Sequence, residues 1–346
     1  MIRRFIDPEL WSNREFMAFV MANSLERFAA SALTIMLAFH VYDVRKEPFD
    51  IALLGIAQVI PALIFSLHGG EIADRRSRRG LVLRTVGLLV AVCGGLVVVS
   101  VTGSFMLPAL LAAAFLSATL RAYQTPAAVG LEAQVLPLHL VLKGVPVVAT
   151  MARISDMVGP VVMGFVWAAW GAGATYGILG GLFCVAYLVL AIRVSEKPIP
   201  AHPANGPGPI PRIVEGVRYV VGNQVLIGSM ALDLFAVFFG GAAALLPIFA
   251  TDILAVGPSG FGLLRAAIAA GALAAAVMSI RFMPRANAGI ALHLIIAGFG
   301  LAMIAFGLST SFLLSLALLF LAGICDGLSM VIRHAILRLA SPEEMR

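Results

Sequence analysis

The sequence predicts an all-α, polytopic membrane protein with about ten transmembrane helices, six in a first half and four in a second. Hydrophobic residues make up 61% of its 346 residues and charged residues only 12%, with a mean hydropathy of +1.00. Soluble domains are nearer half apolar and a quarter charged. The apolar residues form runs of about 20 residues or more, the length that crosses a bilayer as a helix. These runs do not alternate with a period of two, as the strands of a membrane barrel would.

The first half, residues 1–194, contains six apolar runs separated by short polar or glycine-containing breaks. The breaks include charged clusters after the first and second runs, and the charge-free sequences TGS and GAGA further along the chain. We expect this half to fold as a six-helix bundle. Its transmembrane helices are predicted near 14–41, 51–72, 80–101, 105–127, 139–169 and 173–194.

A linker divides the chain at residues 195–212, SEKPIPAHPANGPGPIPR, whose six prolines are incompatible with a helix or a central strand. The segment that follows, IVEGVRYVVGN, is amphipathic and is expected to lie at the membrane interface. Together they define a linker region, 195–222, ahead of a second half, 223–346. Transmembrane helices in the second half are predicted near 223–250, 260–282, 288–309 and 312–338.

Basic residues in the short loops predict the orientation, because such residues are retained on the cytoplasmic side. One side of the predicted bundle has only Arg45 and Lys46, and acids accompany them. We therefore expect the N-terminus and the proline-rich linker to be cytoplasmic. The basic residues that define this cytoplasmic side are Arg3, Arg4, Arg75, Arg76, Arg78, Arg79, Lys143, Arg193, Lys197, Arg212, Arg281 and Arg285.

The loop between the second and third predicted helices carries the pattern G-x-x-x-D-R-x-x-R-R. Gly70 allows two helices to approach closely, and Asp74 is placed to begin the turn and cap the next helix. The pattern resembles the signature loop of the major facilitator superfamily, with Ser77 where that family usually has glycine. This resemblance implies a cytoplasmic latch between helices, whereas the alternative is that the arginines only set the topology. The residues of the implied latch are Gly70, Asp74, Arg75, Arg78 and Arg79.

Other stretches resemble one branch of that superfamily, the enterobactin-exporter-like facilitators. LRAYQTPAAVGLEAQVLP, which contains Arg121, resembles the signature of the fourth helix. SDMVGPVVMG resembles the glycine-proline signature of the fifth helix, and Gly159, Pro160 and Gly164 are implied to form a gating helix. LDLFAVFFGGAAALLPIFATDIL, GFGLLRAAIAAGAL and CDGLSMVIRHAILRLASPEEMR resemble the seventh, eighth and tenth helices. The resemblance covers nearly the whole chain.

The resemblance implies a bundle of two pseudo-symmetric halves in the inner membrane of a bacterium, with a central cavity that opens alternately to the two sides. It implies efflux of a siderophore or an amphipathic drug-like small molecule by a monomeric, proton-coupled antiporter. In the family, two further helices normally follow the tenth. The alternative is therefore a truncated, non-transporting membrane protein, or a remnant of such an exporter.

Charged residues inside the predicted transmembrane helices are the candidates for substrate binding and proton coupling, because a charge in hydrocarbon is costly. Arg121 stays protonated and can hold an anionic group or tune a nearby acid, and the alternative is that it forms a structural pair with an acid. Arg153 and Asp156 lie three residues apart and are expected to pair on one helix face. Each acid has the alternative of being an ordinary solvated or packed carboxylate. The candidates for the cavity and for proton coupling are Arg121, Asp233, Asp326, Arg333, Glu26 and Arg27.

Sequence patterns of other function classes are absent. The six histidines show no metal-ligand spacing, and the chain contains neither a GxxxxGK[ST] phosphate loop nor a nucleophile elbow. Its basic residues come in short clusters between apolar runs, which argues against a nucleic-acid surface. We therefore expect no enzymatic activity, catalytic residue, cofactor or metal. The expected partners are the lipid bilayer, protons and a small-molecule substrate.

Overall fold

The computed structural model describes residues 8–103, 105–198, 244–282 and 288–340, together with isolated positions between 222 and 234. The described residues form helices and turns and no strand, which confirms the all-α prediction. The chain divides into two compact units, Met1–Pro203 and Ala204–Arg346. The division falls inside the proline-rich stretch 195–212.

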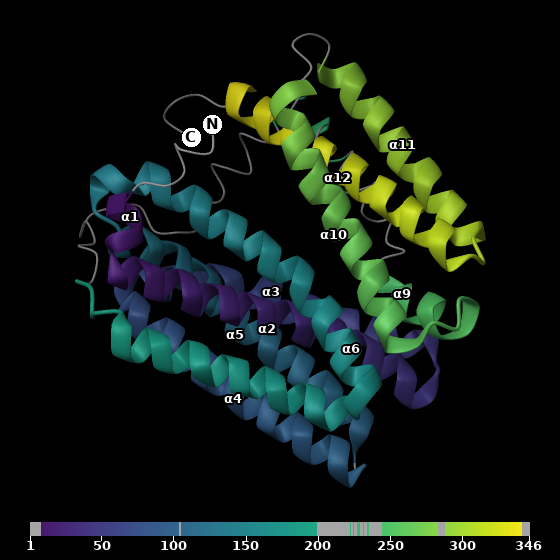
Figure 1. The fold of residues 1–346 in the computed structure, drawn as a ribbon, viewed down its shortest axis with the longest axis horizontal. Helices are drawn as coiled ribbons and strands as arrows, with labels where there is room; N and C mark the ends of the chain where they lie inside the picture. Colours follow the sequence, from purple (N-terminus) through teal and green to yellow (C-terminus); the bar gives the residue numbers. More distant parts are fainter. Residues whose placement is uncertain are drawn as a thin grey trace. The chain divides into compact units, whose positions relative to one another are not determined.

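The first unit begins with a short helix and continues with five long ones (Figure 1). Asn13 caps the second helix, because its side chain accepts a hydrogen bond from the Phe16 N–H at 3.0 Å. Gly103, in the left-handed region at φ 68°, ends the fourth helix. The helices are α1 (Pro8–Ser12), α2 (Arg14–Arg45), α3 (Pro48–Arg75), α4 (Arg78–Thr102), α5 (Met106–Val135) and α6 (Leu138–Arg193).

The long helix α6 consists of two arms that meet at Gly171. Gly171 has φ 77° and ψ −175°, dihedral angles that only glycine adopts readily. We call residues 138–170 the first arm and residues 172–193 the second arm. They correspond to the predicted helices 139–169 and 173–194, joined by one non-helical residue rather than by a longer loop.

Close packing in the first unit depends on small residues between helices. Helix α2 packs against α5 and α6, α3 packs against α5, and α4 packs against α5 and α6. A side chain at Gly159 in the first arm would overlap the Phe28 carbonyl of α2, so this glycine permits the close approach of the two helices. The expectation for Gly70 is wrong. The neighbouring Gly69 packs against the Ala122 backbone of α5, whereas Gly70 faces open space, because it lies on another side of α3.

The described part of the second unit contains three long helices, α10 (Gly257–Phe282), α11 (Ala288–Leu308) and α12 (Phe312–Ala340). Two short elements precede them, α9 (Leu246–Ile248) and a single π-helical turn, Phe249–Ile253. Helix α12 packs against both α10 and α11. Gly271 of α10 and Gly323 of α12 lie directly against the backbone of the facing helix. The α10–α12 contact is therefore as close as the α3–α5 contact at Gly69.

Seven helices in the described part of the chain are long and apolar enough to cross a membrane, judged by length and composition. The stretch Lys143–Arg193 is one of the seven and is divided at Gly171, so it can cross twice. Helix α2 is longer than a single crossing requires, at 32 residues, and it carries more charge than the others. Most of the predicted helix 223–250 lies outside the described residues. The number of ten helices therefore stays a prediction.

Candidate functional site

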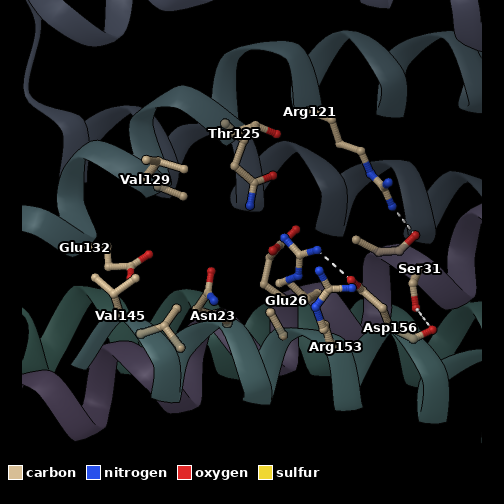
Figure 2. A pocket seen from close by; sticks show the side chains of 17 residues that line it. Asn23, Glu26, Ser31, Arg121, Thr125, Val129, Glu132, Val145, Arg153 and Asp156 are labelled. Atoms are coloured by element: carbon tan, nitrogen blue, oxygen red, sulfur yellow. Dashed lines mark hydrogen bonds and ion pairs between the residues drawn. The ribbon is translucent and has the colours of Figure 1, made fainter. Parts of the chain in front are cut away.

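A cavity of about 460 Å³ lies between α2, α5 and the first arm of α6 (Figure 2). Its walls combine charged and amide side chains from the middle of these helices with small apolar residues. We call it the charged cavity. Its lining residues are Asn23, Glu26, Arg27, Ala30, Ser31, Arg121, Gln124, Thr125, Ala128, Val129, Glu132, Val145, Val148, Ala149, Ala152, Arg153 and Asp156.

An ion pair between α2 and α6 crosses one wall of the charged cavity. Arg27 Nη2 donates to Asp156 Oδ2 at 2.6 Å, and both side chains are partly exposed. The Ser31 hydroxyl donates to the Asp156 backbone carbonyl at 3.3 Å beside it. The expected pairing of Asp156 with Arg153 is wrong, because the packing of α2 on α6 brings Arg27 to this carboxylate. Arg153 lines the cavity without an ion pair or hydrogen bond to the described residues.

Arg121 projects from the middle of α5 onto α2. One of its terminal nitrogens donates to the Ala30 carbonyl and to Thr34 Oγ1, the latter at 3.0 Å. Glu26 is its electrostatic partner on α2, and Gln124 lies beside Glu26. Glu26 and Arg27, adjacent in sequence, thus interact with different helices, α5 and α6. Sequence reasoning selected Glu26, Arg27 and Arg121 separately, and the fold brings all three to one cavity.

Arg121 also lines a second cavity, of about 500 Å³, on the other side of α5 between α2 and α3. Its walls are weakly polar and carry Thr34, Gln58, Ser66 and Ser117. Arg121 and Thr125 line both cavities. The guanidinium therefore lies where a molecule in either cavity could contact it.

Sequence reasoning missed three polar residues of the charged cavity: Asn23, Gln124 and Glu132. Glu132 lies close to the end of α5, past the predicted helix boundary at residue 127, so it was not counted as a charge inside a helix. Asn23 and Gln124 are uncharged, so the cost of placing a charge in the membrane does not single them out. Their positions one turn from Glu26 or Arg121 along the same helices would have revealed them.

The second unit holds the remaining candidates. Asp326 and Arg333 both lie on α12, about two helical turns apart, and each is partly buried. Arg265 lies on α10 and is also partly buried. Asp233 lies outside the described residues.

The arginine-rich loop is tied to two helices of its own unit. Arg78 Nη1 donates to the Gly130 carbonyl of α5 at 3.0 Å, and Arg79 Nη2 donates to the Ala191 carbonyl of α6 at 2.6 Å. Arg75 pairs with Glu71 at 2.8 Å. Gly130 is needed beneath Arg78, because a side chain there would overlap the guanidinium.

The expectation that Asp74 caps the following helix is wrong. Asp74 is still inside α3, where it accepts a long contact of 3.4 Å from Arg78. The cap of α4 is Ser77, whose hydroxyl accepts from the Gly80 N–H at 3.1 Å. The residue that departs from the usual pattern of this loop therefore takes over the capping of α4.

The predicted gating residues lie in the first arm of α6. Gly159, Pro160 and Gly164 are buried, and the helical dihedral angles continue through them. Within α6, the only non-helical residue is Gly171. The gating role of Gly159, Pro160 and Gly164 stays a prediction.

Comparison with known families identifies the chain. The sequence profile of a family described as transmembrane secretion effector matches residues 11–343. The chain belongs to this family. The resemblance to the major facilitator superfamily and its enterobactin-exporter-like branch is confirmed with it.

Individual relatives are distant in sequence but similar over most of the chain. It is 24% identical to the enterobactin exporter EntS of Citrobacter koseri over 325 residues, which cover 91% of this chain and 74% of that protein. The enterobactin exporter of Salmonella typhimurium is 23% identical over the same coverage. The family and these relatives make the chain a multi-pass membrane transport protein.

Solved structures support the same fold. A bacterial homologue of the human lysosomal transporter Spinster, in an inward-facing and unoccupied conformation, has a TM-score of 0.69 at 16% identity, covering 94% of this chain and 75% of that one. The nucleoside transporter NupG has a TM-score of 0.73 at 10% identity, covering 96% and 84%. At such identities the likeness concerns the fold alone.

Proposed function

We propose that this protein is a proton-coupled secondary active exporter of a siderophore or an amphipathic drug-like small molecule. The observation that carries the proposal is the charged cavity, where residues from α2, α5 and α6 gather five charged side chains in the middle of long helices. Charges in this position are costly, and where they occur they commonly mark substrate or ion pathways. The two relatives named above are enterobactin exporters, which supports the direction of transport and the siderophore class.

Residue roles follow from the contacts. Arg121 and Arg27 form part of one wall of the charged cavity and offer donors to a substrate. Glu26 is the proton-carrying candidate in that wall, because it faces Arg121 and lines the cavity. Asp326, with Arg333 on the same helix, and Asp233 are the corresponding candidates in the second half. A carboxylate that exchanges a proton for substrate couples the two equilibria, since each ligand changes the affinity for the other.

In the proposed cycle, alternating access exposes the charged cavity to the cytoplasm and then to the opposite side. The arginine-rich loop, with Arg78 bonded to α5 and Arg79 bonded to α6, acts as the cytoplasmic latch of one of these states. Gly159, Pro160 and Gly164 are the proposed hinge of the gating helix. The orientation proposed for this cycle has the N-terminus in the cytoplasm of a bacterial inner-membrane monomer.

Transport by the purified protein in liposomes tests the proposal. Vesicles with an acidic interior should accumulate enterobactin or the amphipathic dye ethidium against its gradient, and vesicles without a pH difference should not. Glu26→Gln, Asp233→Asn and Asp326→Asn, made singly, should identify the coupling acid as the one whose loss abolishes the response to the pH difference. Asp43→Asn is the control, because Asp43 pairs with Lys46 outside the cavity.

Two results would contradict the proposal. Accumulation of neither compound would argue for the non-transporting alternative. Full response to the pH difference in all three single variants would place the coupling elsewhere or remove proton exchange from the mechanism.

A further inference from the structure

We propose that the charged cavity takes a molecule with an anionic group, and that Arg153 is the residue that binds this group. The inference rests on the proposed export function and narrows its substrate class to amphipathic anions. It follows from comparing the number of arginines with the number of acids that lie at the same depth in the charged cavity.

Three arginines lie at nearly the same depth in the first unit. Helix α2 starts, α5 ends and α6 starts at one end of the bundle, where Glu9 of α1 contacts His139 of α6. At a rise of 1.5 Å per residue, Arg27, Arg121 and Arg153 each lie about 20 Å along their helices from that end. This distance is near the middle of a membrane-spanning helix, since the hydrocarbon core is about 30 Å thick.

Only two acids accompany these three arginines in the cavity at that depth. Asp156 is engaged by Arg27 at 2.6 Å, and Glu26 faces Arg121. Arg153 lines the same cavity, is exposed to it, and has no ion pair with the described residues. One positive charge at this depth is therefore not balanced within the described first unit.

The third acid of the cavity is too far away to balance Arg153. Glu132 lies about 16 Å along α5 from Arg121, near the end of the helix. Figure 2 shows Glu132 beside Val145, at the opposite end of the cavity from Arg153 and Asp156. An ion pair requires the charged atoms to be within about 4 Å. A side chain cannot span this separation.

The chemistry of the missing partner follows from the site. An arginine side chain presents a planar set of donors that suits a carboxylate or a similar flat oxyanion. The nearby Val148, Ala149 and Ala152 supply apolar wall, so the molecule that carries the anion also has apolar surface. Lipid headgroups lie at the membrane surface, well away from the middle of α6. A small amphipathic anion meets these conditions. It offers an oxyanion to Arg153 and apolar surface to the valine and alanine wall, and it is not confined to the membrane surface.

The first experiment needs no ligand and compares thermal unfolding of the purified, full-length protein. Arg27→Gln should lower the unfolding midpoint, because it leaves the Asp156 carboxylate without its partner. Arg153→Gln should leave the midpoint unchanged or raise it, because it removes a charge that has no partner. A fall in Arg153→Gln equal to that in Arg27→Gln would show that the protein itself neutralises Arg153, and this would overturn the inference.

The second experiment measures binding of three probes with one ring system: 2-naphthoate, the uncharged 2-naphthamide and the cation 2-naphthylmethylammonium. Titration calorimetry uses the protein in phosphatidylcholine nanodiscs, with empty nanodiscs as the blank. The wild type should bind naphthoate about tenfold more tightly than naphthamide, as expected for a charge-assisted hydrogen bond. Arg153→Gln should lose this preference, and Arg153→Lys should keep part of it.

The outcomes separate the anion site from the export function. A charge preference that disappears in Arg153→Gln supports the anion site even if no pH-driven accumulation is found, in which case the export proposal fails alone. Accumulation in liposomes together with equal binding of all three probes, or with an unchanged preference in Arg153→Gln, contradicts the anion site alone. If none of the probes binds, the thermal comparison decides.

Discussion

Arg121 contacts α2 with two hydrogen bonds at adjacent turns, to the Ala30 carbonyl and to Thr34 Oγ1. Both bonds come from the same terminal nitrogen, Nη2, which lies one bond further from the backbone than a lysine ammonium would. Arg121 therefore both fixes α5 against α2 and positions a charge beside Glu26. Charged residues of the cavity interact in pairs, Arg121 with Glu26 and Arg27 with Asp156. Which residues pair depends on which faces of the helices meet.

Replacing Arg121 by lysine tests these contacts. Arg121→Lys keeps the positive charge, but the shorter side chain should not reach both acceptors on α2. Substrate transport should therefore fall at least about tenfold, as expected for loss of one charge-assisted hydrogen bond. The amount of protein in the membrane should stay normal. Arg45→Lys is the matched control, since Arg45 is largely exposed, pairs with Asp50 at 3.5 Å and does not line the cavity. Unchanged transport in Arg121→Lys would reduce Arg121 to an incidental charge.

At the scale of elements, glycines determine how closely the helices pack. Gly159 brings the first arm of α6 onto α2, and Gly69 brings α3 onto α5. In the second unit, Gly271 and Gly323 do the same between α10 and α12. In the predicted six-plus-four order, α3 and α5 are the second and fourth helices, and α10 and α12 are the eighth and tenth. Corresponding helices of the two halves thus share a mode of packing, as pseudo-symmetry predicts.

The packing at Gly159 gives a prediction about stability. Gly159→Ala places a methyl group against the Phe28 carbonyl, and overpacking of this kind costs about 1–3 kcal/mol. The variant should unfold at a lower temperature than the wild type. Gly181→Ala, in the second arm of α6 where the added methyl meets open space, should be neutral or slightly stabilising. The measurement is thermal unfolding in detergent, and equal midpoints for the two variants would contradict the role of Gly159.

The sequence allowed the helices to be predicted well, because each is a long apolar run with a polar or glycine boundary. Their contacts could not be predicted in the same way. The pairing of Asp156 with Arg27 rather than Arg153, and the contact at Gly69 rather than Gly70, depend on helix rotation, which a lone apolar run does not determine. Glu132 was missed because α5 extends to Val135, beyond the end of its most apolar part.

At the scale of the whole molecule, the distribution of basic residues predicts which ends of the helices lie in the cytoplasm. The geometry of the first unit agrees with this prediction. One end of the bundle holds the start of α2, the end of α5 and the two arginines Arg78 and Arg79. The connection from α2 to α3, with Arg45, Lys46 and Glu47, belongs to the opposite end.

Labelling of single cysteines tests the orientation. In a variant without Cys93, Cys184 and Cys325, Arg76→Cys should react with a membrane-impermeant thiol reagent only after the cells are opened. Glu47→Cys should react in intact cells, because it lies in the exposed connection between α2 and α3. The opposite pattern would invert the predicted topology, and reaction of both positions in intact cells would exclude a transmembrane α3.

The junction at Gly171 has a consequence for how the protein is made. The two arms of α6 follow each other with one non-helical residue between them, so almost no chain separates them as they leave the ribosome. We expect such a pair to enter the membrane as a helical hairpin, with both arms inserted in one step. The first arm then meets α2 through Gly159, and the second meets α4, where Gly180 packs on Cys93. Lengthening this junction would therefore affect biosynthesis, through misinserted chains, before it affected any step of transport.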